Sequence, residues 1–253
     1  MTSTPTLPSD DAPMGGLSRT QWFVEGARQS FLGPAWLVGF GLAGIGGLAK
    51  MAGFSLEAAV ASTLLIWAGP AQVLFFGGIA AGVALPAIAL SISLSSVRLL
   101  PMGLSLLPQL RTKSTSLAMQ LLASHYIAVT VWTEGMRRVP DVPRGGRMAF
   151  YLGFSNICIL VSTFMTGAGY LLMTKLPPAL GAGLLFLSPV YFVAALLRNA
   201  RAPADWFALV IGLFGTPIAT ILLGPGLDLL AIGLGGGTLA WFLGRRVFKG
   251  KTA

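Results

Sequence analysis

Residues 58–97 contain no charged side chain, and this run constrains the fold more than any other feature of the sequence. As one helix it would be about 60 Å long at ~1.5 Å per residue, whereas the hydrocarbon core of a bilayer is about 30 Å thick. The run therefore predicts two membrane crossings joined by a turn. Gly82-Val83-Ala84-Leu85-Pro86 supplies residues typical of such a turn.

The composition of the whole chain agrees with a membrane location. Hydrophobic residues make up 55% of the 253 residues and charged residues only 10%, far below the roughly 25% of soluble domains. Such an apolar chain is not disordered, and a single cysteine, Cys158, excludes a disulfide framework. We therefore expect an all-α, polytopic integral membrane protein.

The apolar stretches predict seven or eight transmembrane helices, some of them broken by proline or glycine. The stretch at 114–133 is the weakest, because it holds Gln120 and His125, and it decides between the two counts. The eight stretches are residues 29–49, 57–80, 84–107, 114–133, 148–174, 176–197, 206–223 and 226–244.

The charges at the ends of these stretches predict the topology. The chain has 17 basic and 8 acidic residues, and most basic residues fall on one side of the membrane. Eight spans place the N-terminus inside and seven place it outside, with a slight preference for eight. Both put the 134–147 loop and the C-terminus in the cytoplasm. The basic residues lie at span ends without interleaved aromatics, so we expect no nucleic-acid partner.

Three domain regions follow from the same patterns. Residues 1–20 are rich in Ser, Thr, Pro and Asp and predict a disordered N-terminal tail. Residues 21–247 form a single transmembrane transporter domain, and residues 248–253 form a basic cytoplasmic tail.

The first candidate site is the run Gly69, Pro70, Ala71 and Gln72 in the middle of a predicted span. Pro70 has no N–H and its ring clashes with the carbonyl of Ile66, so the helix should break there. A half-helix starting near Ala71 would present a positive dipole end to a substrate carboxylate, and Gln72 adds an amide. The alternative is a simple proline kink.

The second candidate is Arg98, which shares a predicted helix face with Ser91, Ser95, Met102 and Ser105. An arginine inside a membrane is costly and should face a cavity or a partner. Arg98 could hold a carboxylate through two parallel hydrogen bonds. The alternative is that Pro101 ends the helix and Arg98 reaches the headgroups.

His125, the single histidine, is a candidate for proton coupling, because histidine is the residue type that ordinarily gains or loses a proton near physiological pH. The alternative is a core histidine bonded to a backbone carbonyl. One histidine and one cysteine predict no metal site, and the sequence indicates no cofactor. An intramembrane hydrolase built on Ser155 and His125 is a weaker alternative, since nothing resembles an oxyanion hole.

The two motifs resemble the AzlC-type branched-chain amino acid permease family. Its members typically carry a Gly-Ala-Ser-Gln-Phe-like segment in the second span, and then Asn-x-Arg-His-Leu-Leu-Tyr-Gly-x-Ser-Leu-x-Pro in the third. The present sequence keeps Gln72, Arg98, Gly103, Ser105, Leu106 and Pro108. It departs from the pattern at Pro70, Ser96, Leu99 and Met102, and many members have an acidic residue in place of His125. The resemblance covers residues 17–246.

This resemblance implies a non-enzymatic transporter that exports branched-chain or similar apolar amino acids across a bacterial inner membrane. It also implies a small hydrophobic AzlD-type subunit as a partner. No ATP-binding loop is present in the sequence, so either an ion gradient or a separate protein would drive transport. The rival function is a non-transporting membrane scaffold.

Overall fold

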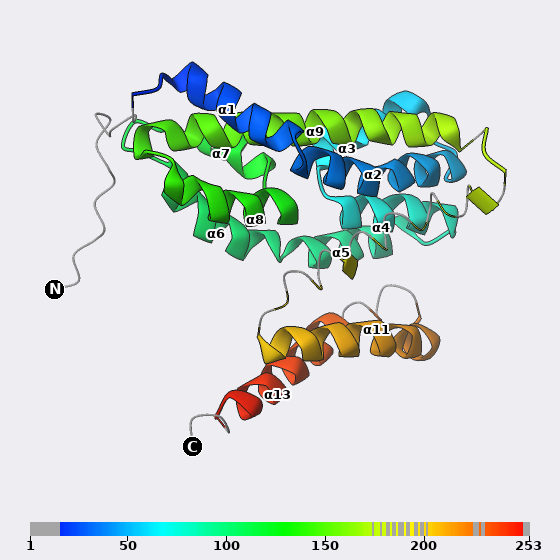
Figure 1. Cartoon of the computed structure of the whole chain (residues 1–253). Helices are drawn as coiled ribbons and strands as arrows, with labels where there is room; N and C mark the ends of the chain where they lie inside the picture. Colours follow the sequence, from blue (N-terminus) through cyan, green and yellow to red (C-terminus); the bar gives the residue numbers. More distant parts are fainter. Residues whose placement is uncertain are drawn as a thin grey trace.

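A long helix, α9 (Arg147–Leu172), is the centre of the fold in the computed structural model. Helices α1 (Arg19–Phe31) and α2 (Pro34–Met51) lie along it (Figure 1). The structure describes residues 16–173, 175–177, 179–180, 183, 186, 190, 193–194, 197, 200, 202–224, 228 and 231–249, with side chains up to residue 245. Most of the expected span at 176–197, residues 1–15 of the expected tail and residues 250–253 lie outside this set.

Glycines let α1 and α2 approach α9 at backbone contact distance. A Cβ on Gly26 would overlap the carbonyl oxygen of Phe150, and a Cβ on Gly153 would overlap that of Phe23. The crossing of α2 and α9 has the same arrangement. A Cβ on Gly46 would overlap the carbonyl oxygen of Thr166, and a Cβ on Gly169 would overlap that of Ala43. Small residues at crossings are typical of helix pairs that associate in lipid, where van der Waals packing replaces the hydrophobic effect.

Six shorter helices form three consecutive broken pairs beside this core. In each pair the chain leaves the helix for two or three residues and then resumes it. The pairs are α3 (Leu56–Ile66) with α4 (Gly69–Ala80), α5 (Leu85–Ser96) with α6 (Leu99–Leu110), and α7 (Leu117–His125) with α8 (Val129–Arg138).

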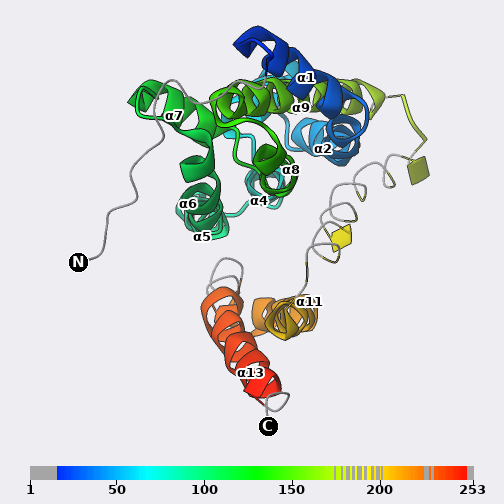
Figure 2. The ribbon, with the colours of Figure 1, turned by 60° about the vertical axis from the view of Figure 1, so that its left-hand side comes forward.

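The C-terminal part contains α11 (Pro203–Leu223), which packs on α13 (Gly237–Lys249) through Gly244 and Ala204 (Figure 2). A π-helical turn, η3 (Ala231–Gly236), leads directly into α13. The short 3-10 turns η1 (Val139–Asp141) and η2 (Arg144–Gly146) join α8 to α9.

Three described helices are long and apolar enough to cross a membrane, namely Pro34–Met51, Arg144–Leu172 and Pro203–Leu223. The pair α5–α6, bent by 41°, makes a fourth if it is one span. The all-α membrane class is thus confirmed for the described residues. The count of seven or eight spans stays a prediction, because α3, α4, α7 and α8 are each too short to cross alone.

Candidate functional site

The first helix break lies where the sequence predicts it. Trp67 ends α3 in a left-handed conformation with φ of 44°, and α4 begins at Gly69 with Pro70 in its first turn. A proline is tolerated in the first turn because the N–H that it lacks has no helical acceptor there. The predicted half-helix is therefore present, and it starts two residues earlier than Ala71.

The second break places Arg98 between two helices. Arg98 occupies the cap position of α6, and Pro101 lies in the first turn of that helix. Pro101 excludes a continuous helix because its ring would clash with the carbonyl of Val97. The expected single helix face from Ser91 through Arg98 to Ser105 is wrong, since the helix axis turns by 41° at this break.

The third break, between α7 and α8, has neither proline nor glycine in residues 125–129. A tertiary contact accompanies it. The indole Nε1 of Trp67 donates a hydrogen bond of 3.1 Å to the carbonyl of Tyr126, which lies in this break. The side chain at the first break therefore satisfies a backbone group that the third break leaves without a helical partner.

All three breaks open onto one pocket of about 490 Å³ of empty space, part of it open to the outside. Eleven residues line it, and Arg98 is the one charged side chain among them. They are Val38 and Leu42 of α2, Trp67, Ala68, Gly69 and Pro70 of the first break, Arg98 and Leu99 of the second, and Ala128, Val129 and Thr130 of the third.

The pocket receives the N-terminal ends of three half-helices. Helices α4, α6 and α8 begin at Gly69, Leu99 and Val129, all of which line the pocket. None of the three has a side-chain cap, whereas α1, α3 and α7 are capped by the serines Ser18, Ser55 and Ser116. Uncapped helix N-termini carry partial positive charge, so this geometry suits an anion. Some N–H groups are not available to a ligand, since Pro70 and Pro101 have none and the N–H of Leu100 bonds to the carbonyl of Val97.

Carbonyl groups at the opposite ends of the breaks are instead bonded to side chains. Leu64, in the last turn of α3, accepts from His125, and Ala123 of α7 accepts from the hydroxyl of Tyr151. With the Trp67–Tyr126 bond, three carbonyls beside the breaks have protein donors. The breaks thus leave helix N-terminal ends, which are partly positive, at the pocket. The carbonyls named here, which are partly negative, are bonded to protein donors.

Arg98 adds a full positive charge to the same pocket wall. Its Nε atom is buried and has no hydrogen-bond partner, and its guanidinium forms no ion pair with any residue that the structure describes. The side chain as a whole is half-buried, and a half-buried cation without a counter-charge is unfavourable in a membrane protein. A carboxylate entering the pocket would supply the missing acceptor with charge-assisted hydrogen bonds.

The other predicted site residues do not line the pocket. Gln72 is fully buried, and its Nε2 donates to Ser62 at 2.9 Å and to Thr63 at 3.0 Å, so it joins α4 to α3 across the break. Its Oε1 is buried without a partner. Ala71 and Ser91 are buried, and Ser95 is half-buried, outside the pocket lining.

His125 also lies outside the pocket lining. Its side chain is exposed, and its Nε2 is 2.9 Å from the Leu64 carbonyl. Because a carbonyl only accepts hydrogen bonds, Nε2 carries a proton in this contact. The sequence left a histidine bonded to a backbone carbonyl as the alternative to proton coupling, and this bond is of that kind. The bond also joins α7 to the last turn of α3.

Several lining residues were not singled out from the sequence. Trp67 lies in the motif around Pro70, but its left-handed backbone has no local signal, because aromatic residues rarely adopt it. Ala128, Val129 and Thr130 had no signal, since the third break depends on contacts far away in sequence. Val38 and Leu42 look like any apolar residues of a span.

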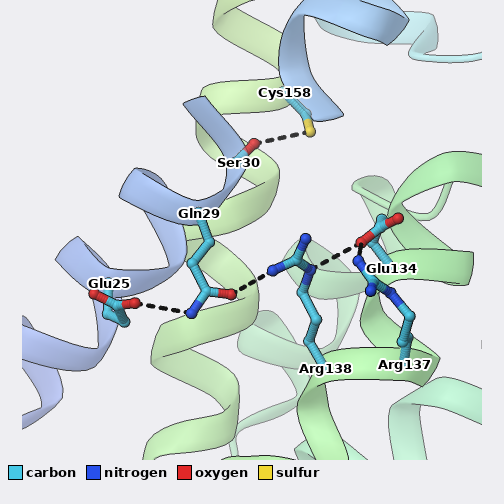
Figure 3. Close-up of polar contacts among 7 residues, drawn as sticks. All are labelled: Glu25, Gln29, Ser30, Glu134, Arg137, Arg138 and Cys158. Carbon is cyan, nitrogen blue, oxygen red and sulfur yellow. Dashed lines mark hydrogen bonds and ion pairs between the residues drawn. The ribbon is translucent and has the colours of Figure 1, made fainter. Parts of the chain in front are cut away.

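A polar network outside the pocket ties α8 to α1 (Figure 3). Arg138 donates to Gln29 at 2.6 Å and to Glu134 at 2.8 Å, and Gln29 donates to Glu25 at 2.8 Å. Burial alone would raise the pKa of Glu134, but hydrogen bonds and charge from Arg137 and Arg138 outweigh it and hold the pKa below its ordinary value. The network fixes the end of α8 opposite to the one at the pocket.

A second contact between α1 and the core joins Ser30 and Cys158, whose Oγ and Sγ atoms are 3.1 Å apart (Figure 3). Both side chains are fully buried. Among the residues that the structure describes, no three His, Cys, Asp or Glu side chains lie together as metal ligands would.

The fold and the pocket define an all-α membrane protein with a pocket at broken helices, and broken helices of this kind are typical of secondary transporters. A comparison with family models matches residues 35–176, more than half of the chain, to the family described as AzlC protein. The chain belongs to the AzlC family, which consists of membrane transporters of branched-chain amino acids. The match covers all three breaks and stops before α11. Comparisons with curated proteins and with solved structures found no match.

Proposed function

We propose that the protein exports branched-chain or similar apolar amino acids across the inner membrane of a bacterium, driven by an ion gradient. The substrate carboxylate binds Arg98 and the N-terminal ends of α4, α6 and α8, and the aliphatic side chain lies against Val38 and Leu42. The observation that carries this proposal is the meeting of three uncapped half-helices and an unpaired arginine at one pocket.

The proposal includes the parts of the transporter that surround this site. The pair α3–α4 crosses the membrane as one broken span, and the pair α7–α8 either crosses or re-enters, which gives eight or seven spans with the C-terminus in the cytoplasm. His125 is the candidate for proton coupling, because it bridges α7 and the end of α3 next to the first break. A small AzlD-type subunit is the proposed partner.

The test compares Arg98 with a matched arginine at the other end of the same helix. Arg98→Gln should abolish leucine efflux from cells, and Arg98→Lys should weaken it, because lysine keeps the charge but lacks the planar fork. Arg111→Gln is the control, since Arg111 caps the C-terminal end of α6 and its Nε is also buried without a partner. Full efflux by Arg98→Gln would contradict the proposed role of Arg98 in binding the carboxylate and would leave it a role as a membrane anchor.

The rival functions predict different results in the same experiment. A non-transporting scaffold predicts no efflux by the wild type and no effect of Arg98→Gln. A hydrolase predicts turnover that depends on Ser155, whose hydroxyl donates to the carbonyl of Tyr151 at 2.7 Å within its own helix. That bond is a common way for a serine to satisfy its hydroxyl in a helix, which favours a structural role for Ser155.

A further inference from the structure

The proposed carboxylate site accounts for one of the two charged groups of an amino acid. The ammonium group is bonded to the same carbon atom as the carboxylate, so its partners must lie in the same pocket, beside the groups that hold the carboxylate. An ammonium has only donors, and it needs acceptors to replace the water that it loses on binding. No Asp or Glu is among the described residues that line the pocket, so the acceptors there are neutral oxygen atoms.

The backbone carbonyl of Trp67 is the first such oxygen. Trp67 lines the pocket and follows the last residue of α3, in a left-handed conformation with φ of 44°. Backbone strain of this kind is concentrated at binding and catalytic sites. The position beyond the last turn of α3 is also the negative end of that helix, and such ends of broken helices bind cations in transporters.

The carbonyl of Trp67 differs from its neighbours in its hydrogen bonding. The carbonyl of Ala68, another lining residue, accepts the N–H of Gln72 at 3.0 Å. That of Ala128 accepts the N–H of Trp132 at 2.7 Å. No described backbone N–H donates to the carbonyl of Trp67. This carbonyl is therefore an acceptor that the helices do not use.

The hydroxyl of Thr130 is the second neutral oxygen. Thr130 is the second residue of α8, and among the described lining residues it is the one whose side chain carries an oxygen atom. A hydroxyl has two lone pairs, so it can accept from an ammonium while its own hydrogen goes elsewhere. The indole of Trp67 bonds to the carbonyl of Tyr126 at 3.1 Å, which ties the break that holds Trp67 to the break that precedes Thr130.

We infer that the ammonium of the substrate binds the carbonyl of Trp67 and the hydroxyl of Thr130, while the carboxylate binds Arg98. The inference rests on the carboxylate site of the proposed function and adds the partners of the second charged group. The substrate is then bound as a zwitterion that joins the second break to the first and the third. Thr130 thereby sets the preference for amino acids over carboxylates that have the same aliphatic skeleton and no ammonium.

Calorimetry of the purified protein with leucine and with 4-methylpentanoate tests this inference, because the two ligands differ only in the ammonium. We expect the wild type to bind leucine at least about tenfold more tightly, since a hydrogen bond to a charged group contributes that much. Thr130→Val keeps the shape of the side chain and removes its oxygen. We expect it to lower the affinity for leucine about tenfold and to change that for 4-methylpentanoate less than about twofold.

Two further variants are matched to this one. Thr130→Ser keeps the hydroxyl and should keep the preference for leucine. Thr133→Val removes a hydroxyl from the same helix, one that donates to the carbonyl of Val129 at 2.8 Å and does not line the pocket. It should leave the ratio of the two affinities unchanged.

The outcomes separate this inference from the proposed function. Equal binding of leucine and 4-methylpentanoate by the wild type overturns the ammonium site and leaves the carboxylate site intact. An undiminished preference for leucine in Thr130→Val overturns the role of Thr130, and so does a loss of that preference in Thr130→Ser. Binding of neither ligand by the wild type overturns the carboxylate site of the proposed function as well.

Discussion

Two regions of the molecule treat their helices in opposite ways. One is the core of α9 with α1 and α2, and the other is the set of three broken helix pairs. In the core, helices are continuous and glycines bring them together until backbone atoms touch. In the broken pairs, helices stop halfway, and their free ends face a pocket. Both regions are apolar in sequence, so hydrophobicity alone does not distinguish them.

The difference shows where rigidity and function reside. A membrane offers no water to satisfy a backbone group, so a broken helix persists only if other groups replace the lost hydrogen bonds. Here His125, Trp67 and Tyr151 supply several of them by donating to backbone carbonyls. The close crossings on α9 give the rigid frame against which such breaks can be held.

The largest effect is expected from the frame. In Gly169→Ala the new methyl would overlap the backbone carbonyl of Ala43, so α2 and α9 must separate. We expect a loss of at least about 3 kcal/mol in the free energy of unfolding, measured by denaturation in detergent. Gly77→Ala is the control, because no atom lies within 4 Å of its added methyl. It should change stability by less than about 1 kcal/mol. Equal effects of the two would refute the packing argument.

Pro70→Ala tests whether the first break builds the site. Alanine permits a continuous helix through residues 66–70, so we expect at least about a tenfold loss of leucine transport while expression is kept. Pro86→Ala is the matched control, since Pro86 is also a first-turn proline but is exposed and does not line the pocket. Normal transport by Pro70→Ala would make the break independent of its proline.

Trp67→Phe tests the bond between the first and third breaks. Phenylalanine keeps the ring but removes the N–H that satisfies the Tyr126 carbonyl, and a buried carbonyl left unpaired costs about 1–3 kcal/mol. We expect that loss in thermal or denaturant unfolding, together with weaker ligand binding. Trp206→Phe, at a half-exposed position of α11, should change stability by less than about 0.5 kcal/mol.

Ala68→Ser tests the idea that the free helix end serves the ligand. Ala68 has the extended conformation of a cap residue, so serine can cap α4 and stabilise the protein by about 1 kcal/mol. The same cap occupies N–H groups that the ligand would use, and carboxylate affinity should fall. A variant that gains stability and keeps its affinity would show that α4 does not contact the ligand.

The smallest effect concerns pH. The pKa of Glu134 is lowered in the folded protein, so its contribution to stability is complete above the ordinary pKa of a carboxyl group. It is lost as pH falls through the lowered value. We expect about 0.5 kcal/mol from this half-exposed cluster. The difference between the unfolding curves of wild type and Glu134→Gln should show it. Glu25 is present in both proteins, so its contribution to stability cancels in this difference.

Much of the fold and part of the site could be predicted from the sequence. Pro70 predicts a helix break from the local sequence alone, because proline lacks the N–H that would form a helical hydrogen bond. Arg98 predicts a cavity, because a charged side chain exposed to lipid is unfavourable in free energy. The assumed single face through Ser91, Arg98 and Ser105 failed, because Pro101 acts on the carbonyl of Val97 and bends the helix at the arginine itself.

The sequence by itself determined the all-α membrane class and the position of the break at Pro70, because these depend on composition and on bonds between neighbouring residues. The tertiary structure decided that three breaks meet at one pocket, that Gln72 joins two half-helices and that His125 bonds to Leu64. A helix end without partners is a local property. What satisfies it depends on which distant segments the glycine crossings of α9 bring beside it, and no local pattern encodes that.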